Sequence, residues 1–122
     1  MNWLPILFAL NVSLLFLHEM DAIRAKEWKM IIVLKDMKEQ TGYLVFSLAH
    51  LPLFFWIIFV ISQTVIGGYV LVWLLTDIFL IAHAGIHFFF RKHSANGFNN
   101  AYSNILIYGM AVLGLIHILL MI

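Results

Sequence analysis

The sequence predicts an all-α integral membrane protein, a bundle of four membrane-spanning helices. Three observations lead to this prediction: the composition, four apolar segments of helical length, and basic residues confined to one side of the membrane. Of the 122 residues, 64% are hydrophobic and only 11% are charged. A chain this short has too little interior to hide so much apolar surface from water, so lipid has to cover the excess.

The four apolar segments each come near the ~20 residues that a helix needs to cross the hydrocarbon core. None of them alternates polar and apolar residues over ~10 positions, as the strands of a membrane barrel do. The first segment lacks the basic start of a signal peptide, so we expect it to be retained. We predict a single transmembrane domain over residues 1–122, with spans at about 3–22, 43–61, 67–90 and 98–122.

The three connections between the spans differ in charge. Residues 23–40 carry many charges and have apolar residues at helical spacing, which predicts an interfacial amphipathic helix lying along the headgroups. Residues 62–68 carry no charge, and residues 91–97 end in the turn-forming pair Asn96-Gly97. All three connections are short, so neighbouring spans should be antiparallel.

The basic residues predict the orientation in the membrane. All seven lie in the first and third connections: Arg24, Lys26, Lys29, Lys35, Lys38, Arg91 and Lys92. By the positive-inside rule that side is cytoplasmic, which places both termini outside in a multi-pass protein of the cell membrane. The formal net charge of +1 gives no sign of a nucleic-acid partner.

Four histidines from three spans are predicted to lie at one depth. At ~1.5 Å per helical residue, their distances along the chain from the charged connections put all four roughly 6–12 Å inside the cytoplasmic boundary. Ionisable groups within spans are costly, usually face the bundle interior and mark functional sites. The four residues are His18, His50, His83 and His87.

The spacing of two of these histidines is typical of metal ligands. His83 and His87 are one turn apart, so both imidazoles project from one face of the third span. We predict that they bind a divalent metal, zinc or iron, and that the other two histidines complete the ligand set. Glu19 or Asp21 would act as a carboxylate ligand or as a catalytic base. The chain has no cysteine, so thiolate ligands are excluded.

Three functions are compatible with this layer of histidines. In a metal-dependent enzyme, zinc would activate water to hydrolyse an ester or amide of a lipid-like substrate, whereas iron would oxidise it. In an electron-transfer protein, histidines from opposed spans would ligate haem b. In a non-enzymatic adaptor, the histidines would be interhelical hydrogen-bond glue, and the charged connection would bind a membrane-protein partner or a second copy of the chain.

The sequence also predicts roles for three other residues within the spans. Asp77 lies near the middle of the third span, either as a neutral hydrogen-bonded group or as a proton relay. His117 lies near the outer face, away from the other histidines, and we expect it to be a hydrogen-bonded packing residue. Pro52 is predicted to kink the second span close to His50.

The segment His18-Glu19-Met20-Asp21-Ala22, followed by Glu27-Trp28, resembles the signature of a family of small uncharacterised bacterial membrane proteins. There is a more distant likeness to membrane proteins with a His-x-x-Glu-Glu motif, although Asp21-Ala22 stands in place of the double glutamate. The spacing of His83 and His87 is similar to the HxxxH pairs of alkaline-ceramidase-type hydrolases and membrane fatty-acid hydroxylases. These resemblances imply a four-span layout and local metal chemistry, and neither of the first two families supplies an established activity.

Overall fold

In the computed structural model, which describes residues 3–67 and 70–122, every regular element is a helix. The elements are α1 (Trp3–Arg24), the 3-10 helix η1 (Glu27–Met30), α2 (Glu39–Ala49), α3 (Leu51–Gly67), α4 (Val70–Phe90) and α5 (Ala101–Met121). Four stretches are long and apolar enough to cross a membrane: α1, the joined helices α2 and α3 over Glu39–Ser62, α4 and α5. The predicted all-α bundle of four membrane spans is therefore confirmed.

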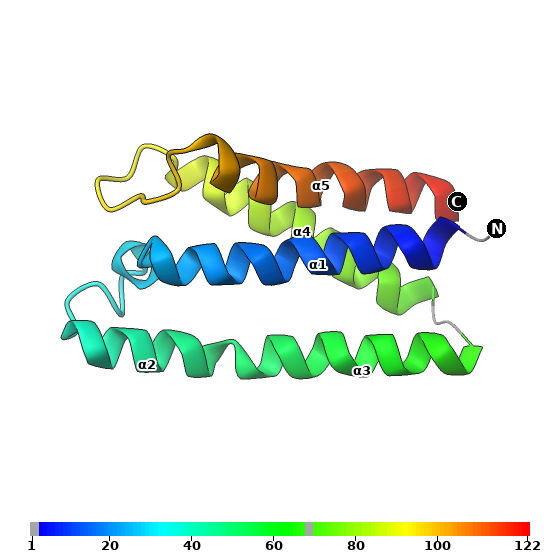
Figure 1. Cartoon of the computed structure of the whole chain (residues 1–122), viewed down its shortest axis with the longest axis horizontal. Coiled ribbons are helices and arrows are strands. Elements are labelled where there is room, and N and C mark those ends of the chain that lie inside the picture. Colours follow the sequence, from blue (N-terminus) through cyan, green and yellow to red (C-terminus); the bar gives the residue numbers. More distant parts are fainter. Residues whose placement is uncertain (1–2, 68–69) are drawn as a thin grey trace.

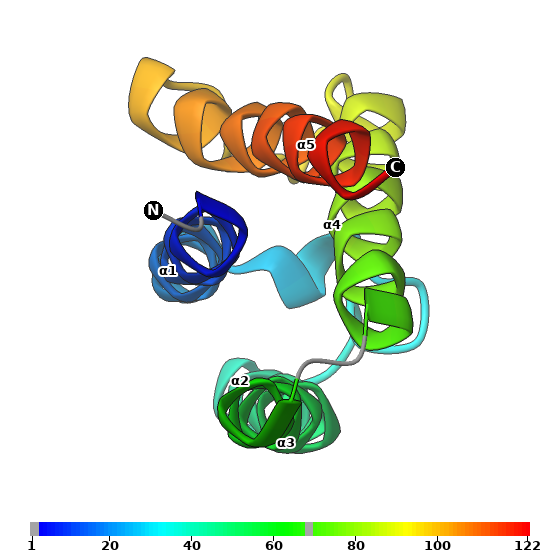
Figure 2. The same ribbon diagram turned by 90° about the vertical axis from the view of Figure 1, so that its right-hand side faces the viewer.

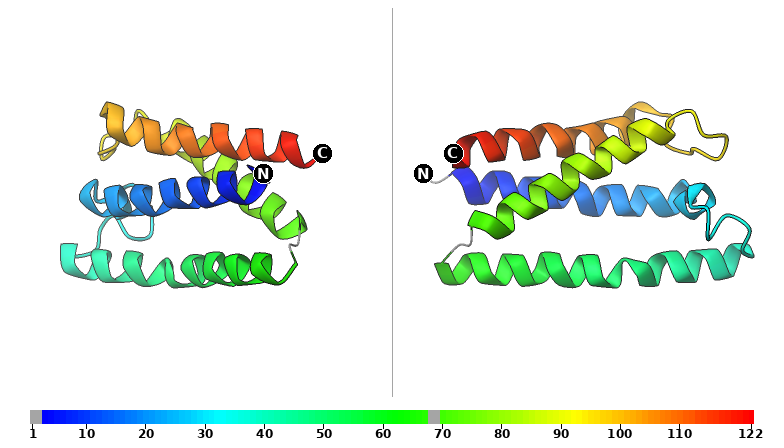
Figure 3. Two further views of the ribbon diagram at one scale, coloured as in Figure 1. Left: turned by 45° about the vertical axis from the view of Figure 1, so that its right-hand side comes forward. Right: turned by 180° about the vertical axis from the view of Figure 1, so that it is seen from behind.

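The helices run back and forth along a common direction. Figure 1 shows the two termini at one end of the bundle, and the α1–α2 and α4–α5 connections at the other. The view from behind in Figure 3 shows the same arrangement, with α4 crossing the others obliquely. The two charged connections thus lie on the same side. The uncharged connection starts later than predicted, because α3 continues to Gly67; Gly68 lies outside the described residues.

The helices pack most closely where α5 meets α1 and α4. Figure 2, which looks along the bundle, shows α1 between α5 and the α2–α3 segment, with α4 beside them. Side chains from α1, α3, α4 and α5 form an apolar cluster that fills the space between these helices. Its fully buried members are Leu15, Ile57, Val60, Leu80 and Met110.

The second span is interrupted at His50, between α2 and α3 and two residues before Pro52, where the sequence predicts a kink. Pro52 has no backbone N–H to continue the helical bonding, and the helix tightens in the turn before it. The backbone N–H of His50 donates to Ser47 rather than to the carbonyl of Phe46. The Phe46 carbonyl instead accepts a hydrogen bond from the imidazole Nδ1 of His50 at 2.7 Å. The hydrogen bond at this interruption therefore fixes the orientation of the His50 ring.

The connection between α1 and α2 is less regular than the predicted amphipathic helix. Lys26 adopts a left-handed conformation (φ 52°, ψ 51°), which stops α1 and turns the chain. Beyond it, regular helix is limited to η1. The apolar positions still divide as an interfacial segment requires, since Trp28 and Leu34 are buried whereas Ile32 and Val33 are exposed. The segment thus covers the end of the bundle.

A topology reporter tests which end of the bundle faces the cytoplasm. A topology reporter fused after Ile122 should be active outside the cytoplasm, and one inserted beside Lys92 should be active inside. The reason is the confinement of all seven basic residues to the two connections at one end. The reverse pattern would move the histidine layer to the outer leaflet.

Candidate metal centre

Three histidine side chains meet where α1 faces the C-terminal half of α4. The Nε2 atoms of His18 and His83 are 2.9 Å apart, and those of His83 and His87 are 3.2 Å apart. Each ring offers a nitrogen, and these nitrogens all lie within 4.8 Å of one another, so the group could hold a metal ion. The structure brings together three of the four histidines that the sequence places at this depth. We call these three residues the histidine triad.

Hydrogen bonding alone cannot satisfy the triad. A neutral imidazole nitrogen offers either one N–H or one lone pair, yet His83 Nε2 has an imidazole nitrogen on each side of it. A metal ion would take one lone pair from each ring. With Zn–N distances of about 2.0–2.1 Å, the ligands of a tetrahedral zinc site lie roughly 3.3 Å apart. The separations of 2.9 and 3.2 Å are close to this value.

Aromatic side chains hold the triad in place and shield it. The ring of Phe98, in the connection before α5, lies 5.4 Å from that of His18 and 4.8 Å from that of His87. On the other side, Phe79 stacks on His83 at 5.8 Å. His18 is fully buried, and its Nδ1 has no hydrogen-bond partner. The triad therefore lies in surroundings of low polarity, where a bound cation is screened less by water.

His50, the fourth predicted metal ligand, forms a separate pair with Glu19. Its Nε2 lies 2.8 Å from Oε2 of Glu19. Its Nδ1 faces the carbonyl of Phe46, which can only accept a hydrogen bond, so Nδ1 carries a proton. If the ring were neutral, its Nε2 would then have only a lone pair, which cannot bond to a carboxylate oxygen. The contact with Glu19 therefore needs a second proton, shared between Nε2 and the carboxylate. The Glu19–His50 pair thus holds a transferable proton next to the triad.

A second carboxylate, Glu27, reaches the triad from η1. Its Oε1 lies 3.4 Å from Nε2 of His87. Burial and the nearby negative charge of Glu19 raise the pKa of Glu27 to about 7, against a smaller lowering by His50. The sequence singles out Glu27 only as part of the Glu27-Trp28 signature. Nothing else in the sequence indicates that Glu27 lies in the site.

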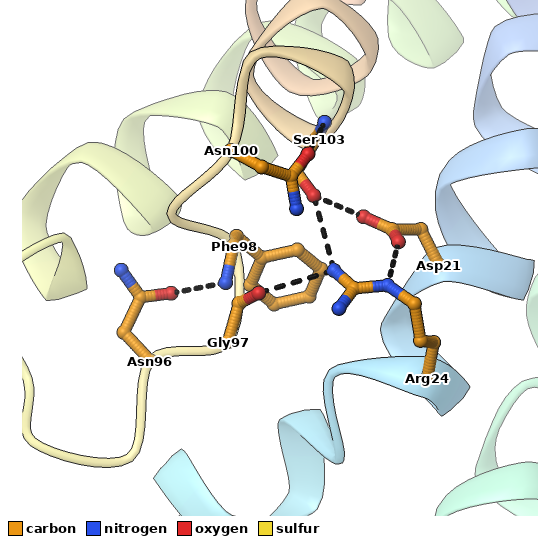
Figure 4. A network of polar contacts seen from close by, with 7 residues as sticks. All are labelled: Asp21, Arg24, Asn96, Gly97, Phe98, Asn100 and Ser103. Atoms are coloured by element: carbon orange, nitrogen blue, oxygen red, sulfur yellow. Dashed lines mark hydrogen bonds and ion pairs between the residues drawn. The ribbon is translucent and has the colours of Figure 1, made fainter.

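Asp21, the other carboxylate predicted for the site, is engaged elsewhere. Its two oxygens accept hydrogen bonds from Arg24 Nε and from the Ser103 hydroxyl. Arg24 also donates to the carbonyl of Gly97 at 3.1 Å, so this network ties the end of α1 to the α4–α5 connection and to α5 (Figure 4). Asn100 caps α5 by accepting a hydrogen bond from the Ser103 backbone N–H. The geometry thus gives Asp21 a positioning role, and sequence reasoning missed Ser103.

A model of one protein family matches residues 4–122, nearly the whole chain, and is described as a family of unknown function, DUF6713. The chain belongs to this family. This agrees with the predicted membership of an uncharacterised family. The match to DUF6713 does not bear on the likeness to His-x-x-Glu-Glu proteins. No curated protein and no solved structure matches the chain.

This DUF6713 chain contains a second buried polar group, far from the triad along the helices. Nδ1 of His117 on α5 lies 2.6 Å from Oδ2 of Asp77 on α4. The side-chain amide of Asn11 on α1 lies beside the other carboxylate oxygen of Asp77, at 3.4 Å. Asp77 and His117 are both fully buried. The expected hydrogen-bonded packing role of His117 fits this geometry, but the sequence did not identify Asp77 as its partner.

Proposed function

We propose that this protein binds a divalent metal, zinc in the first place, through His18, His83 and His87, and that it hydrolyses an ester or amide bond of a lipid-like substrate at the cytoplasmic leaflet. The observation that carries the proposal is the convergence of three Nε2 atoms, from two helices, at the spacing of metal ligands. Catalytic zinc sites keep few protein ligands and leave a position open for water.

The same spacing disfavours haem. The two axial nitrogens of a haem lie on opposite sides of the iron, about 4 Å apart with the macrocycle between them. The Nε2 atoms of His18 and His83 are 2.9 Å apart and those of His83 and His87 are 3.2 Å apart, so neither pair has room for a porphyrin plane between its two nitrogens.

The Glu19–His50 pair supplies the acid and base that hydrolysis needs. Zinc lowers the pKa of a bound water to about 7, so that hydroxide forms near neutral pH. The hydroxide oxygen would bond to the carbonyl carbon while the bond to the leaving oxygen or nitrogen breaks. The pair would give its shared proton to the leaving group and regain one from the water, so that protons balance over the reaction.

An apolar groove beside the triad supports a lipid-like substrate. It has a volume of about 340 Å³ and lies between the α1–α2 connection and the last turns of α4. Its lining is apolar except for one member of the triad: Met30, Ile31, Ile32, Val33, Ile86, His87 and Phe90. An acyl chain in this groove would bring its headgroup linkage to the metal at interface depth.

Elemental analysis of protein purified without chelator, together with its absorption spectrum, tests the proposal. About one zinc per chain and a colourless protein are expected. Stoichiometric iron without a Soret band would keep the site but favour oxidation. A Soret band would favour haem-based electron transfer. Folded protein that neither contains nor takes up metal would contradict the proposal and favour the adaptor function.

A further inference from the structure

The α1–α2 connection brings one carboxylate into the triad. Glu27 opens η1 directly after the left-handed turn at Lys26. The Glu27 side chain is only 16% exposed, and its Oε1 lies 3.4 Å from His87 Nε2. That same nitrogen faces His83 Nε2 at 3.2 Å. An oxygen from the connection thus adjoins the nitrogens that converge from α1 and α4.

No lysine or arginine in the described part of the chain forms an ion pair with Glu27. The neighbouring Lys26 is paired with Glu39, Glu27 contacts the His87 ring, and the nearby His50 is already paired with Glu19. Glu19 adds a second carboxylate nearby, which makes the local charge still more negative. A buried carboxylate is costly unless it is paired or coordinates a metal. A divalent cation in the triad would supply the missing charge.

The residue after Glu27 fixes where this carboxylate points. Trp28 is 3% exposed and packs on Phe46 of α2, with ring centroids 5.7 Å apart. Gly42 makes this possible, because a Cβ there would come within 2.7 Å of the Trp28 ring. η1 is therefore anchored to α2 through Trp28, while Glu27 faces the triad.

We infer that Glu27 is a fourth ligand of the metal, which completes a set of three imidazoles and one carboxylate. This inference rests on the proposed function. The ion would then fasten the α1–α2 connection to α1 and α4, in addition to its role in catalysis. Three histidines and one carboxylate suit zinc or iron, and in a zinc site water would enter by displacing the Glu27 carboxylate or by expansion of the zinc to five ligands.

Cobalt(II) is a suitable probe, because its visible absorption reports the number and kind of its ligands. The purified full chain, with its native metal removed, is titrated with cobalt(II) as the wild type and as Glu27→Gln, Glu27→Asp, Glu39→Gln and His83→Ala. Glu27→Gln keeps the size of the side chain but removes its charge. For this variant we expect a shifted visible band and a cobalt affinity lower by about 10- to 100-fold or more. A loss of that size is typical even for a group that only hydrogen-bonds to a ligand. Glu27→Asp should recover part of the affinity.

Glu39→Gln is the matched control, since it makes the same chemical change in an exposed carboxylate. Glu39 lies at the start of α2 and pairs with Lys26. It should titrate like the wild type. Trypsin gives a second reading, because the connection contains Lys29 and Lys35. Cobalt should slow cleavage there in the wild type and in Glu39→Gln, but not in Glu27→Gln.

Two outcomes would overturn the inference in distinguishable ways. If Glu27→Gln keeps the wild-type affinity, band and protection while His83→Ala loses cobalt, the triad is the metal site and Glu27 is not a ligand. If the folded wild type binds no cobalt, zinc or iron, the proposed function fails together with the inference.

Discussion

Replacing His83 with alanine should lower the affinity for zinc by at least 100-fold. His83 is the central member of the triad, with Nε2 atoms of both other rings within 3.2 Å. Loss of a group that only supports a ligand typically costs ~10- to 100-fold in metal affinity, and loss of a direct ligand should cost at least as much. The measurement is zinc per chain after dialysis against buffered free zinc, with thermal unfolding as the check of folding. His87→Ala should behave in the same way.

His93→Ala is the matched control for this loss. His93 lies in the α4–α5 connection, is exposed, and accepts a hydrogen bond from the backbone N–H of Ala95. Its replacement should leave the zinc content unchanged.

His50→Ala separates two roles of His50. Loss of zinc in this variant would make His50 a ligand, whereas retained zinc with lost hydrolysis would leave His50 in the Glu19–His50 pair. Folded His83→Ala and His87→Ala variants with undiminished metal would mean that the triad is interhelical hydrogen-bond glue.

Replacing Asp77 with leucine should lower the free energy of unfolding by about 3–5 kcal/mol, the range for removing one partner of a buried pair. His117 Nδ1 would lose its partner at 2.6 Å. It would be left in fully buried surroundings where water cannot replace the bond. Denaturant or thermal unfolding in detergent measures the change.

Asp77→Asn separates charge from hydrogen bonding at the same position. The amide oxygen can still accept from His117, so the loss should be only the difference between a charged and a neutral hydrogen bond, about 1 kcal/mol. Zinc content should stay at the wild-type level in both variants, because this pair is distinct from the triad. An Asp77→Leu variant as stable as the wild type would show that the pair contributes nothing to folding.

Four apolar helices and the meeting of three histidines at one level of the bundle could be predicted from the sequence, because both follow from local rules. Hydropathy over ~20 residues identifies a span, and a rise of ~1.5 Å per residue fixes how deep each side chain lies. Pro52 marks the interruption of the second span for an equally local reason. The same rules predict that His18, His83 and His87 lie in one layer, without any knowledge of the contacts between them.

Depth along a helix does not tell which neighbour a side chain faces. For this reason the predictions for His50 and Glu27 differ from the structure. His50 lies in the predicted layer, but the tightened turn before Pro52 directs its ring to the Phe46 carbonyl and to Glu19. Glu27 was out of reach of the same reasoning, because it enters the site through a left-handed turn and a 3-10 helix. The hydrophobic spacing of residues 23–40 had predicted a regular helix there.

The most direct test of the metal site is the X-ray absorption spectrum at the zinc edge of protein loaded with one equivalent of zinc. A first shell of nitrogen and oxygen at about 2.0–2.1 Å is expected, with the multiple-scattering pattern of three imidazoles, since three Nε2 atoms converge in the triad. A shell with one imidazole or none, or a folded protein that binds no zinc, would contradict the assignment of His18, His83 and His87 as metal ligands.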